Sequence, residues 1–466
     1  MQMKIPYDIL VGVIEVQEAH GDLPGISSMS QTCRTLRGVA ARHLLNQQVT
    51  LRNANDVVSF SLFMRSDNGR RLPLLRRCLV IKSGPLSEDA ASSLVKLITE
   101  ISHLERLVLR DADEVLASDP RLPRAFAALT CLKHLDFSMT KDPENPEPCV
   151  YMLTRMRSRL VTATLHPPVV VRRWHEGQVS DGLSDPISLL RSSASTLTEL
   201  SGTWLQARKH RTVFPNVKRL RVLLHLIPDI TPYIVAYPNL TSLDVRCGAT
   251  MDEDILPGMS WLNQEGQQRT GCWPTLDSLE GRTMDLYVIA LRCHVKSLTV
   301  HASQRHQAGD VTLLADVLSR ARPVHLDLEV DSSSVVSETS SGLEAIFLGS
   351  GISSCIQSLE LRIVMDPKTD LDQLISRTVT IVHSVTLTSF KLELDFSNRV
   401  IRLDRFARDT QLPPKFVPSE VAQGACNAST REKALNLKQN LPTLKSFVVK
   451  PPCRCNKCSE SGVDPC

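Results

Sequence analysis

The sequence predicts an α/β fold, in which a short helical module is followed by an irregular solenoid built around a parallel sheet. Three observations lead to this prediction. Apolar residues recur at helical spacing over residues 5–45, a short apolar motif recurs from about residue 75 onward, and helical patterns lie between several copies of that motif. One copy cannot bury its apolar side alone, so the copies are expected to stack.

Length and composition limit the class of protein. The 466 residues suffice for two or three domains or for one elongated array. Hydrophobic residues make up 42%, charged residues 22%, and the net charge is only +4, which is typical of globular proteins and indicates neither a nucleic-acid nor a membrane partner. No stretch approaches the roughly 18 to 20 apolar residues of a membrane span. We expect an intracellular protein of the cytoplasm, the nucleus or both, with its thirteen cysteines reduced.

The first segment is expected to form two or three short helices. Pro6 suits a first helical turn, where its missing N–H costs nothing. An apolar stripe follows, formed by Ile9, Leu10, Val13, Ile14 and Val16. Gly21 then interrupts the helix, and Asp22 is a candidate N-cap for a second one. A second stripe contains Ile26, Met29, Cys33, Leu36 and Ala40. About forty residues bury little apolar surface alone, so part of it should face a partner.

These residues resemble an F-box. The match runs through Ile5-Pro6, Asp8-Ile9-Leu10, Ile14, Thr32-Cys33-Arg34, Leu36 and Val39-Ala40. The family usually has Leu, Glu and Val where this chain has Ile5, Asp8 and Thr32. The resemblance implies that residues 1–45 dock on a Skp-type adaptor, which joins the protein to a cullin-based ubiquitin ligase. The adaptor contacts it implies are Ile5, Pro6, Ile9, Leu10, Ile14, Ile26, Met29, Cys33 and Leu36. Alternatively, these helices only cap the solenoid.

Residues 46–74 are interpreted as a linker. Val49 and Leu51 alternate as in a short strand. Val57, Phe60 and Met64 then suggest a helix that runs to Arg65.

From about residue 75 a short apolar motif recurs. It contains two apolar residues separated by one position, and a third apolar residue lies three positions before the first of these two. The clearest copies occupy residues 104–109, 132–137, 217–222, 240–245, 295–300, 356–361 and 444–449, and weaker copies lie at 197–200, 276–279, 326–328 and 387–394. Each copy predicts a short strand with alternate side chains facing inward. Stacked units of this kind are typical of leucine-rich repeats. Irregular spacing and the missing repeat asparagine predict a divergent array over residues 75–450; a compact α/β domain is the alternative.

The remaining segments complete the array. Ala90–Ser102 and Val311–Arg320 are amphipathic and predict helices on its outer face. Residues 398–434 are interpreted as a loop or insertion, and near 75–81 either Cys78/Val80 or Leu79/Ile81 could face inward. Residues 451–466 contain Cys453, Cys455, Cys458 and Cys466; a reduced, disordered tail is favoured over a zinc site, because only one close C-x-x-C pair is present.

The sequence contains no catalytic motif that we recognise, so we expect neither an enzyme nor a cofactor or metal. The positions that flank the inward residues should line the exposed sheet face. They include Arg106, Arg110, Arg219 and Arg221 early in the array, and Asp327, Glu329, Glu360, Glu393 and Asp395 late in it. A basic-to-acidic surface of this kind would suit a protein ligand of reverse polarity.

The sequence thus favours a substrate-recognition subunit of a Skp/cullin/F-box-type ubiquitin ligase. Its partners would be a Skp-type adaptor, the cullin core and an unknown protein substrate. The alternative is a leucine-rich-repeat scaffold without a ligase role. Nucleic-acid binding is the weakest interpretation, because basic doublets such as Arg76-Arg77 are common on solvated repeat faces. Burial of Ile5, Pro6, Ile9, Leu10 and Ile14 against the repeats would weaken the docking hypothesis.

Overall fold

A computed structural model of the chain describes residues 7–140, 145–167, 185–208, 211–224, 229–247, 253–301, 310–336, 342–349, 355–366, 369–395, 441 and 443–450. The chain divides into two compact units. Unit 1 comprises Met1–His225 and Pro232–Leu240, and unit 2 comprises Leu226–Thr231 and Thr241–Cys466.

In unit 1, seven parallel strands are paired in chain order. They are β1 (Gln48–Leu51), β2 (Cys78–Ile81), β3 (Arg106–Leu109), β4 (His134–Ser138), β5 (Thr162–His166), β6 (Glu199–Leu205) and β7 (Arg219–Leu224). Unit 2 repeats this arrangement with β8 (Ser242–Cys247), β9 (Thr275–Arg282), β10 (His294–His301), β11 (His325–Asp331), β12 (Ser358–Val364), β13 (Ser389–Asp395) and β14 (Leu444–Lys450). The predicted α/β fold with stacked parallel strands is therefore confirmed.

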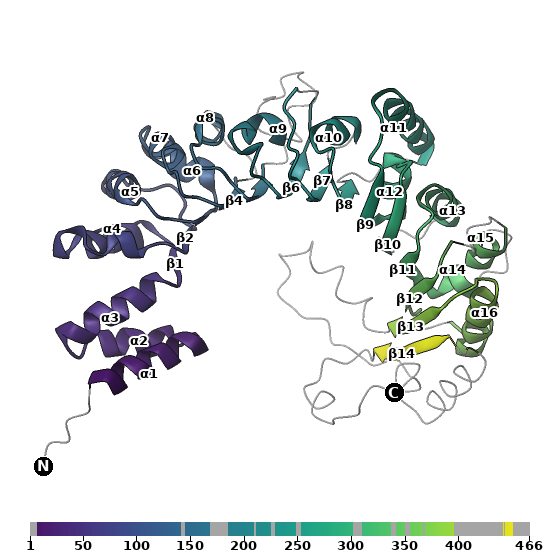
Figure 1. The fold of residues 1–466 in the computed structure, drawn as a ribbon, viewed down its shortest axis with the longest axis horizontal. Helices are drawn as coiled ribbons and strands as arrows, with labels where there is room; N and C mark the ends of the chain where they lie inside the picture. The colour runs from purple at the N-terminus through teal and green to yellow at the C-terminus, as the bar shows by residue number, and fades with distance from the viewer. Residues whose placement is uncertain are drawn as a thin grey trace, which may run out of the picture. The chain divides into compact units, whose positions relative to one another are not determined.

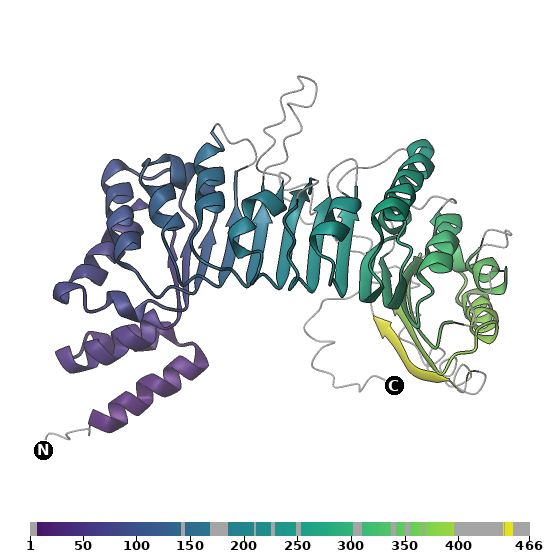
Figure 2. The ribbon, with the colours of Figure 1, turned by 45° about the horizontal axis from the view of Figure 1, so that its top comes forward.

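Helices connect successive strands and cover one face of the strands in each unit (Figures 1 and 2). Unit 1 begins with α1 (Tyr7–His20), α2 (Leu23–Ser30) and α3 (Arg34–Leu45), followed by α4 (Ala54–Arg65), η1 (Asp67–Gly69), η2 (Leu72–Leu74), α5 (Glu88–Glu100), α6 (Ala112–Ala117), α7 (Leu122–Ala127), α8 (Glu147–Arg155), α9 (Pro186–Leu189) and η4 (Arg191–Ser193). The chain continues with α10 (Thr231–Ala236), η5 (Glu253–Ile255), α11 (Leu256–Thr270), α12 (Thr283–Ile289), α13 (Asp310–Ala321), α14 (Ser332–Val336), α15 (Leu343–Gly349) and α16 (Leu371–His383). The two predicted outer helices correspond to α5 and α13.

The core lies between strands and helices, and alternate strand residues enter it. In β4, Leu135 and Phe137 are buried while the intervening Asp136 is half-buried. The ambiguous register of β2 is resolved by its pairing, which aligns Leu79 and Ile81 with the inward leucines of β3. Cys78 and Val80 instead form a separate apolar cluster with Val108 of β3.

One predicted strand has a further role, and one strand is absent from the prediction. The short strand expected around Val49 and Leu51 is β1; it also pairs in register with β2 and so begins the sheet. Strand β5 was not among the predicted copies. Its inward positions are Leu160, Ala163 and Leu165, all buried, and the small side chain of Ala163 weakens the apolar signal without preventing burial.

Buried serine side chains hydrogen-bond the backbone of neighbouring loops in unit 1. The fully buried Ser158 hydroxyl donates to the Leu129 carbonyl at 2.6 Å and accepts from the Leu132 amide at 3.1 Å. One repeat later, the buried Ser193 hydroxyl accepts from the Leu160 amide at 3.0 Å. These bonds satisfy buried loop backbone groups that would otherwise destabilise the stack.

Candidate docking surfaces

Helices α1, α2 and α3 form a small module with a core of its own. Four fully buried residues make up this core, namely Ile14, Ile26, Leu36 and Ala40. Leu10, Met29, Val39 and Leu44 pack around them and are partly buried. Each helix contributes at least one core residue, so the module folds around contacts among its own helices.

Polar contacts hold the helix ends of the module in place. Asp22 caps α2 as predicted, because its carboxylate accepts from the Gly25 amide at 3.0 Å. Glu18 of α1 pairs with His43 and accepts from Asn46 and Gln47, each at 3.2 Å. The hydrogen bond from His43 lowers the pKa of the Glu18 carboxyl below its ordinary value. Glu18 therefore fastens α1 to the end of α3.

An apolar stripe on α1 faces away from this core. Ile9, Val13 and Val16 follow one another at steps of four and three residues, and they are 56%, 40% and 57% exposed. Including Tyr7 and Leu23, five of the twelve large hydrophobic residues that are exposed in the described chain lie within residues 7–23. Such a concentration is typical of an interaction site, whereas single exposed apolar residues are common on any surface. We call Ile9, Val13 and Val16 the α1 stripe.

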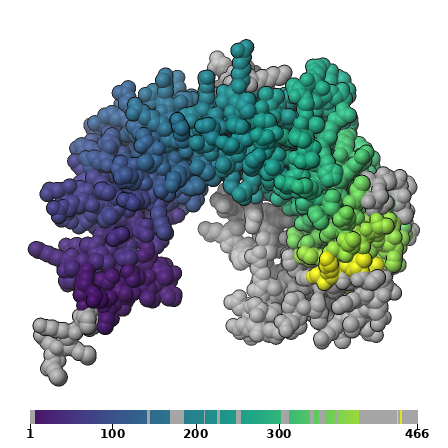
Figure 3. Space-filling model, viewed as in Figure 1, coloured from purple at the N-terminus to yellow at the C-terminus, as the bar shows by residue number. Residues whose placement is uncertain are grey.

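The repeats do not cover the α1 stripe. Within the described part of unit 1, the main packing partners of α1 are α2 and α3, and α3 in turn contacts β1. Figure 3 shows the module, in purple, at the end of unit 1 with its visible side open to solvent. Ile9 is therefore not buried against the repeats, although that burial would be expected if the helices only capped the array.

The adaptor contacts implied by the F-box resemblance differ in how exposed their side chains are. Ile9 is exposed, Leu10 and Met29 are partly buried, and Cys33 is exposed with its sulfur accepting from the Leu36 amide at 3.5 Å. Three others lie in the module core and can assist docking only by shaping the module: Ile14, Ile26 and Leu36. Ile5 and Pro6 lie outside the described residues.

Sequence reasoning left two exposed residues of the α1 stripe, Val13 and Val16, out of the contact set. A helical wheel could have found them. Relative to Ile9, these two valines stay within about 40° on the helix, whereas Leu10 and Ile14 are rotated by about 100° or more. The apolar residues of α1 thus form two separate faces, and only one of them enters the core.

The predicted basic residues of unit 1 lie on the sheet face opposite the helices. Arg106 is aligned with His134 across β3 and β4, on the side away from the buried leucines. Two of the other arginines are already paired. Arg110 contacts Asp136 at 2.7 Å, and Arg219 contacts Glu199 at 2.7 Å. Arg221 occupies the same face of β7 as Arg219, so the four arginines share one face, but part of their charge is neutralised there.

In unit 2, the predicted acidic residues come together on neighbouring strands. Register aligns Asp327 with Glu360, and it aligns Glu329, Arg362 and Glu393 across β11, β12 and β13. Arg362 contacts Glu393 at 2.8 Å and Glu329 at 3.7 Å. Burial, followed by the nearby Glu360 carboxylate, raises the pKa of the Asp327 carboxyl above its ordinary value.

This face of β11 to β13 has an excess of negative charge. It carries six carboxylates and two cations: Asp327, Glu329, Asp331, Glu360, Glu393 and Asp395 against Arg362 and Lys391. Glu329, Asp331 and Asp395 are buried, and all three have interactions in the structure. The local excess of four negative charges would favour a basic ligand.

His301, at the end of β10, should report on this acidic face. Its ring lies 2.9 Å from Glu280 and 3.8 Å from Glu329, and its pKa is raised, first by the Glu329 interaction and then by Glu280. The charged ring is therefore favoured in the folded protein. Its stabilising contribution is complete below the ordinary histidine pKa and is lost as the pH rises through the raised value. Replacing Glu329 with glutamine should lower the pKa of His301.

An NMR titration of the His301 ring protons measures this change, with the ring of His103 in unit 1 as an internal control. A titration of His301 that is unchanged in the Glu329→Gln protein would contradict the assignment.

Comparisons with known proteins add no assignment. A scan against protein-family models and a search of curated proteins found no match to this sequence.

None of the described helices is both long enough and apolar enough to cross a bilayer. Among the described residues, no group of three or more His, Cys, Asp or Glu side chains is arranged to hold a metal ion. The cysteines of residues 451–466 and the proposed insertion at 398–434 lie outside the described residues.

Proposed function

We propose that this protein is the substrate-recognition subunit of a Skp/cullin/F-box-type ubiquitin ligase. The α1 stripe carries the proposal, because it leaves three apolar side chains exposed on a module that already has a complete core. The order of apolar residues that resembles an F-box supports it further. On this proposal, residues 1–45 dock on the adaptor and the parallel array is a divergent leucine-rich-repeat domain that holds a protein substrate.

The α1 stripe has enough apolar surface to matter in docking. Complete burial of a valine or isoleucine side chain is worth roughly 1.5–3 kcal/mol, and the stripe residues are about half exposed. Their combined burial would contribute on the order of 2–4 kcal/mol before the costs of association. This is a substantial share of a micromolar affinity, which corresponds to about 8 kcal/mol.

The role of the chain on this proposal is to bring a substrate close to the transferring enzyme. Tethering raises the effective concentration of the substrate, so the receptor needs affinity and correct geometry but no reactive group of its own. The unit 2 face formed by β11 to β13, with its excess of carboxylates, is one candidate substrate surface. A substrate with a basic segment would complement it.

The test compares adaptor binding of the full chain with that of an Ile9→Asp, Val16→Asp double variant. Two carboxylates in the docking interface should weaken binding of a purified Skp-type adaptor by about 100-fold or more. Leu62→Asp is the matched control, because Leu62 is 68% exposed on α4 of the same unit. Binding can be measured by calorimetry, with circular dichroism to verify folding.

The result expected is tight adaptor binding by the unmodified chain and by Leu62→Asp, and its loss in the double variant. If the folded, unmodified chain bound no Skp-type adaptor, the ligase proposal would be overturned. The protein would then be better described as a leucine-rich-repeat interaction scaffold with no ubiquitin-ligase role.

A further inference from the structure

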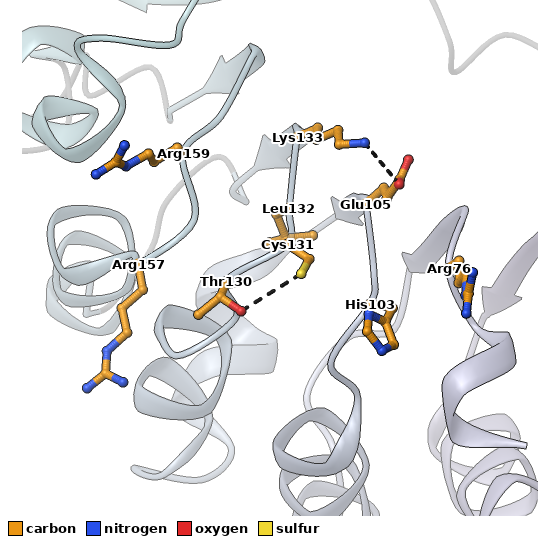
Figure 4. Close-up of a pocket in the computed structure, with 9 residues that line it drawn as sticks. All are labelled: Arg76, His103, Glu105, Thr130, Cys131, Leu132, Lys133, Arg157 and Arg159. Carbon is orange, nitrogen blue, oxygen red and sulfur yellow. Dashed lines mark hydrogen bonds and ion pairs between the residues drawn. The ribbon is translucent and has the colours of Figure 1, made fainter. Parts of the chain in front are cut away.

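Unit 1 contains a groove with a basic lining where its strands begin. The groove encloses about 550 Å³ and lies beside the loops that lead into β2, β3, β4 and β5 (Figure 4). Four successive loops each supply a cationic or titratable side chain: Arg76, His103, Lys133, and the pair Arg157 and Arg159. Of these residues, the sequence analysis names only Arg76, as part of the basic doublet Arg76-Arg77.

The local fold forces the two arginines of the last loop outward. In the segment that joins α8 to β5, Met156, Ser158 and Leu160 are buried. The alternate residues, Arg157 and Arg159, are therefore exposed beside the groove. The backbone is fixed as well, because the Arg157 amide donates to the Ala127 carbonyl at 2.9 Å.

The groove has an unbalanced positive charge. Four cations, Arg76, Lys133, Arg157 and Arg159, face one carboxylate, Glu105, which gives a net charge of +3 with His103 neutral. Glu105 is engaged by Lys133, whose ammonium group lies 3.0 Å from it.

The three arginines of the groove have no acidic partner among the described residues. The side chain of Arg76 donates to the Pro73 carbonyl at 3.0 Å. The side chains of Arg157 and Arg159 have no hydrogen bond or ion pair within the described chain. Guanidinium groups stay protonated at any physiological pH, so this charge is permanent.

We infer that this groove binds an extended, Asp- and Glu-rich segment of a partner protein. Figure 4 shows the cations around the groove, with Arg157 and Arg159 on one side, Arg76 and His103 on the other, and Thr130 and Cys131 between them. Separate single charges along an extended segment match this distribution better than one compact dianion does. Each free guanidinium fork can take a carboxylate in a bidentate contact.

A nucleic acid fits the groove less well than an acidic peptide. Binding sites for single strands rely on large aromatic side chains that stack with the bases, and no Phe, Tyr or Trp side chain lines this groove. Its uncharged lining consists of Thr130, Cys131 and Leu132, which suits a polypeptide chain. The inference depends on the proposed function only in assigning the acidic segment to a ubiquitination substrate. Binding itself does not require the adaptor.

The test measures fluorescence anisotropy of labelled twelve-residue peptides with the full chain, in the absence of any adaptor. The probes are a peptide with four spaced glutamates, its glutamine counterpart, a singly phosphorylated neutral peptide, and a single-stranded oligonucleotide of equal charge. The variant is Arg157→Glu, Arg159→Glu. Its charge-matched control is Lys96→Glu, Arg124→Glu, which changes exposed residues of α5 and α7 outside the groove.

The glutamate peptide should bind the unmodified chain and the control alike. It should bind the groove variant about tenfold more weakly, and its affinity should fall as salt is raised. Equal binding of the glutamine peptide, or equal weakening in the control, would overturn the inference. Tighter binding of the phosphopeptide or the oligonucleotide would also overturn it, in favour of that ligand. Since no adaptor is present, none of these outcomes bears on the docking proposal.

Discussion

Replacing Gln267 with leucine is expected to destabilise unit 2 by about 3 kcal/mol. Helix α11 buries three polar residues beside the apolar Leu256, while two of its large apolar side chains face solvent. Ser260, Asn263 and Gln267 are buried, whereas Trp261 and Leu262 are exposed. The stability of this helix therefore depends on hydrogen bonds at its inner face more than on apolar packing.

The buried amides of α11 satisfy the end of α12. The Gln267 amide donates to the carbonyls of Ile289 and Ala290, each at 3.1 Å, and its oxygen accepts from the Arg292 amide at 3.2 Å. The last carbonyls of a helix have no partner within the helix. Leucine has a similar volume but cannot donate, so these carbonyls would lose their partner in a buried environment, at about 1–3 kcal/mol each.

Hydrogen exchange measured by mass spectrometry on peptides that cover residues 283–301 should detect this change. A loss of 3 kcal/mol corresponds to roughly a 100-fold faster exchange of amides that open with the unit. The neighbouring Gln268 is exposed on α11, so Gln268→Leu is the matched control and should leave exchange unchanged. Equal exchange in the two variants would show that the Gln267 contacts contribute little.

Replacing Ile14 with alanine is expected to destabilise the amino-terminal module by about 2–4 kcal/mol, by loss of buried apolar contact and creation of a cavity. Ile14 is completely buried where α1, α2 and α3 meet. The module has only about forty residues, so an effect of this size should expose much of it to exchange. Val13→Ala, at the exposed neighbouring position, should change stability by less than about 0.5 kcal/mol.

Hydrogen exchange in peptides from residues 7–45 tests this prediction. Repeating the measurement with excess adaptor distinguishes residues of the module core from residues that contact the adaptor. A ligand that binds only the folded module stabilises it by mass action. High adaptor concentration should therefore restore protection in Ile14→Ala. It should leave the exchange of the Ile9→Asp, Val16→Asp variant unchanged, because that variant keeps its core but no longer binds the adaptor. Full protection of Ile14→Ala without adaptor would mean that the module core is less important than its burial indicates.

Periodicity in the sequence was sufficient to identify most strands of the described chain, but only the N-terminal helices, α4, α5 and α13 among its helices. Strands leave a signal of period two in which apolar side chains alternate, and helices leave one of period 3.6. The predicted copy at residues 104–109 became β3, the predicted cap Asp22 caps α2, and the helix expected to run to Arg65 ends there in α4. These features depend on residues that are close together in the sequence, and they could therefore be predicted from short segments of it.

Periodicity could not show which apolar faces enter a core and which stay exposed after the elements pack. An apolar residue leaves the same mark in the sequence whether it enters a core or faces a partner, so Ile9 and Ile14 were placed in one contact set although only Ile9 is exposed. The groove beside Arg157 and Arg159 was not foreseen, because the residues that line it lie up to 83 positions apart in the sequence, from Arg76 to Arg159. Packing alone brings such loops together, since strands that are distant in sequence become neighbours only when the array stacks.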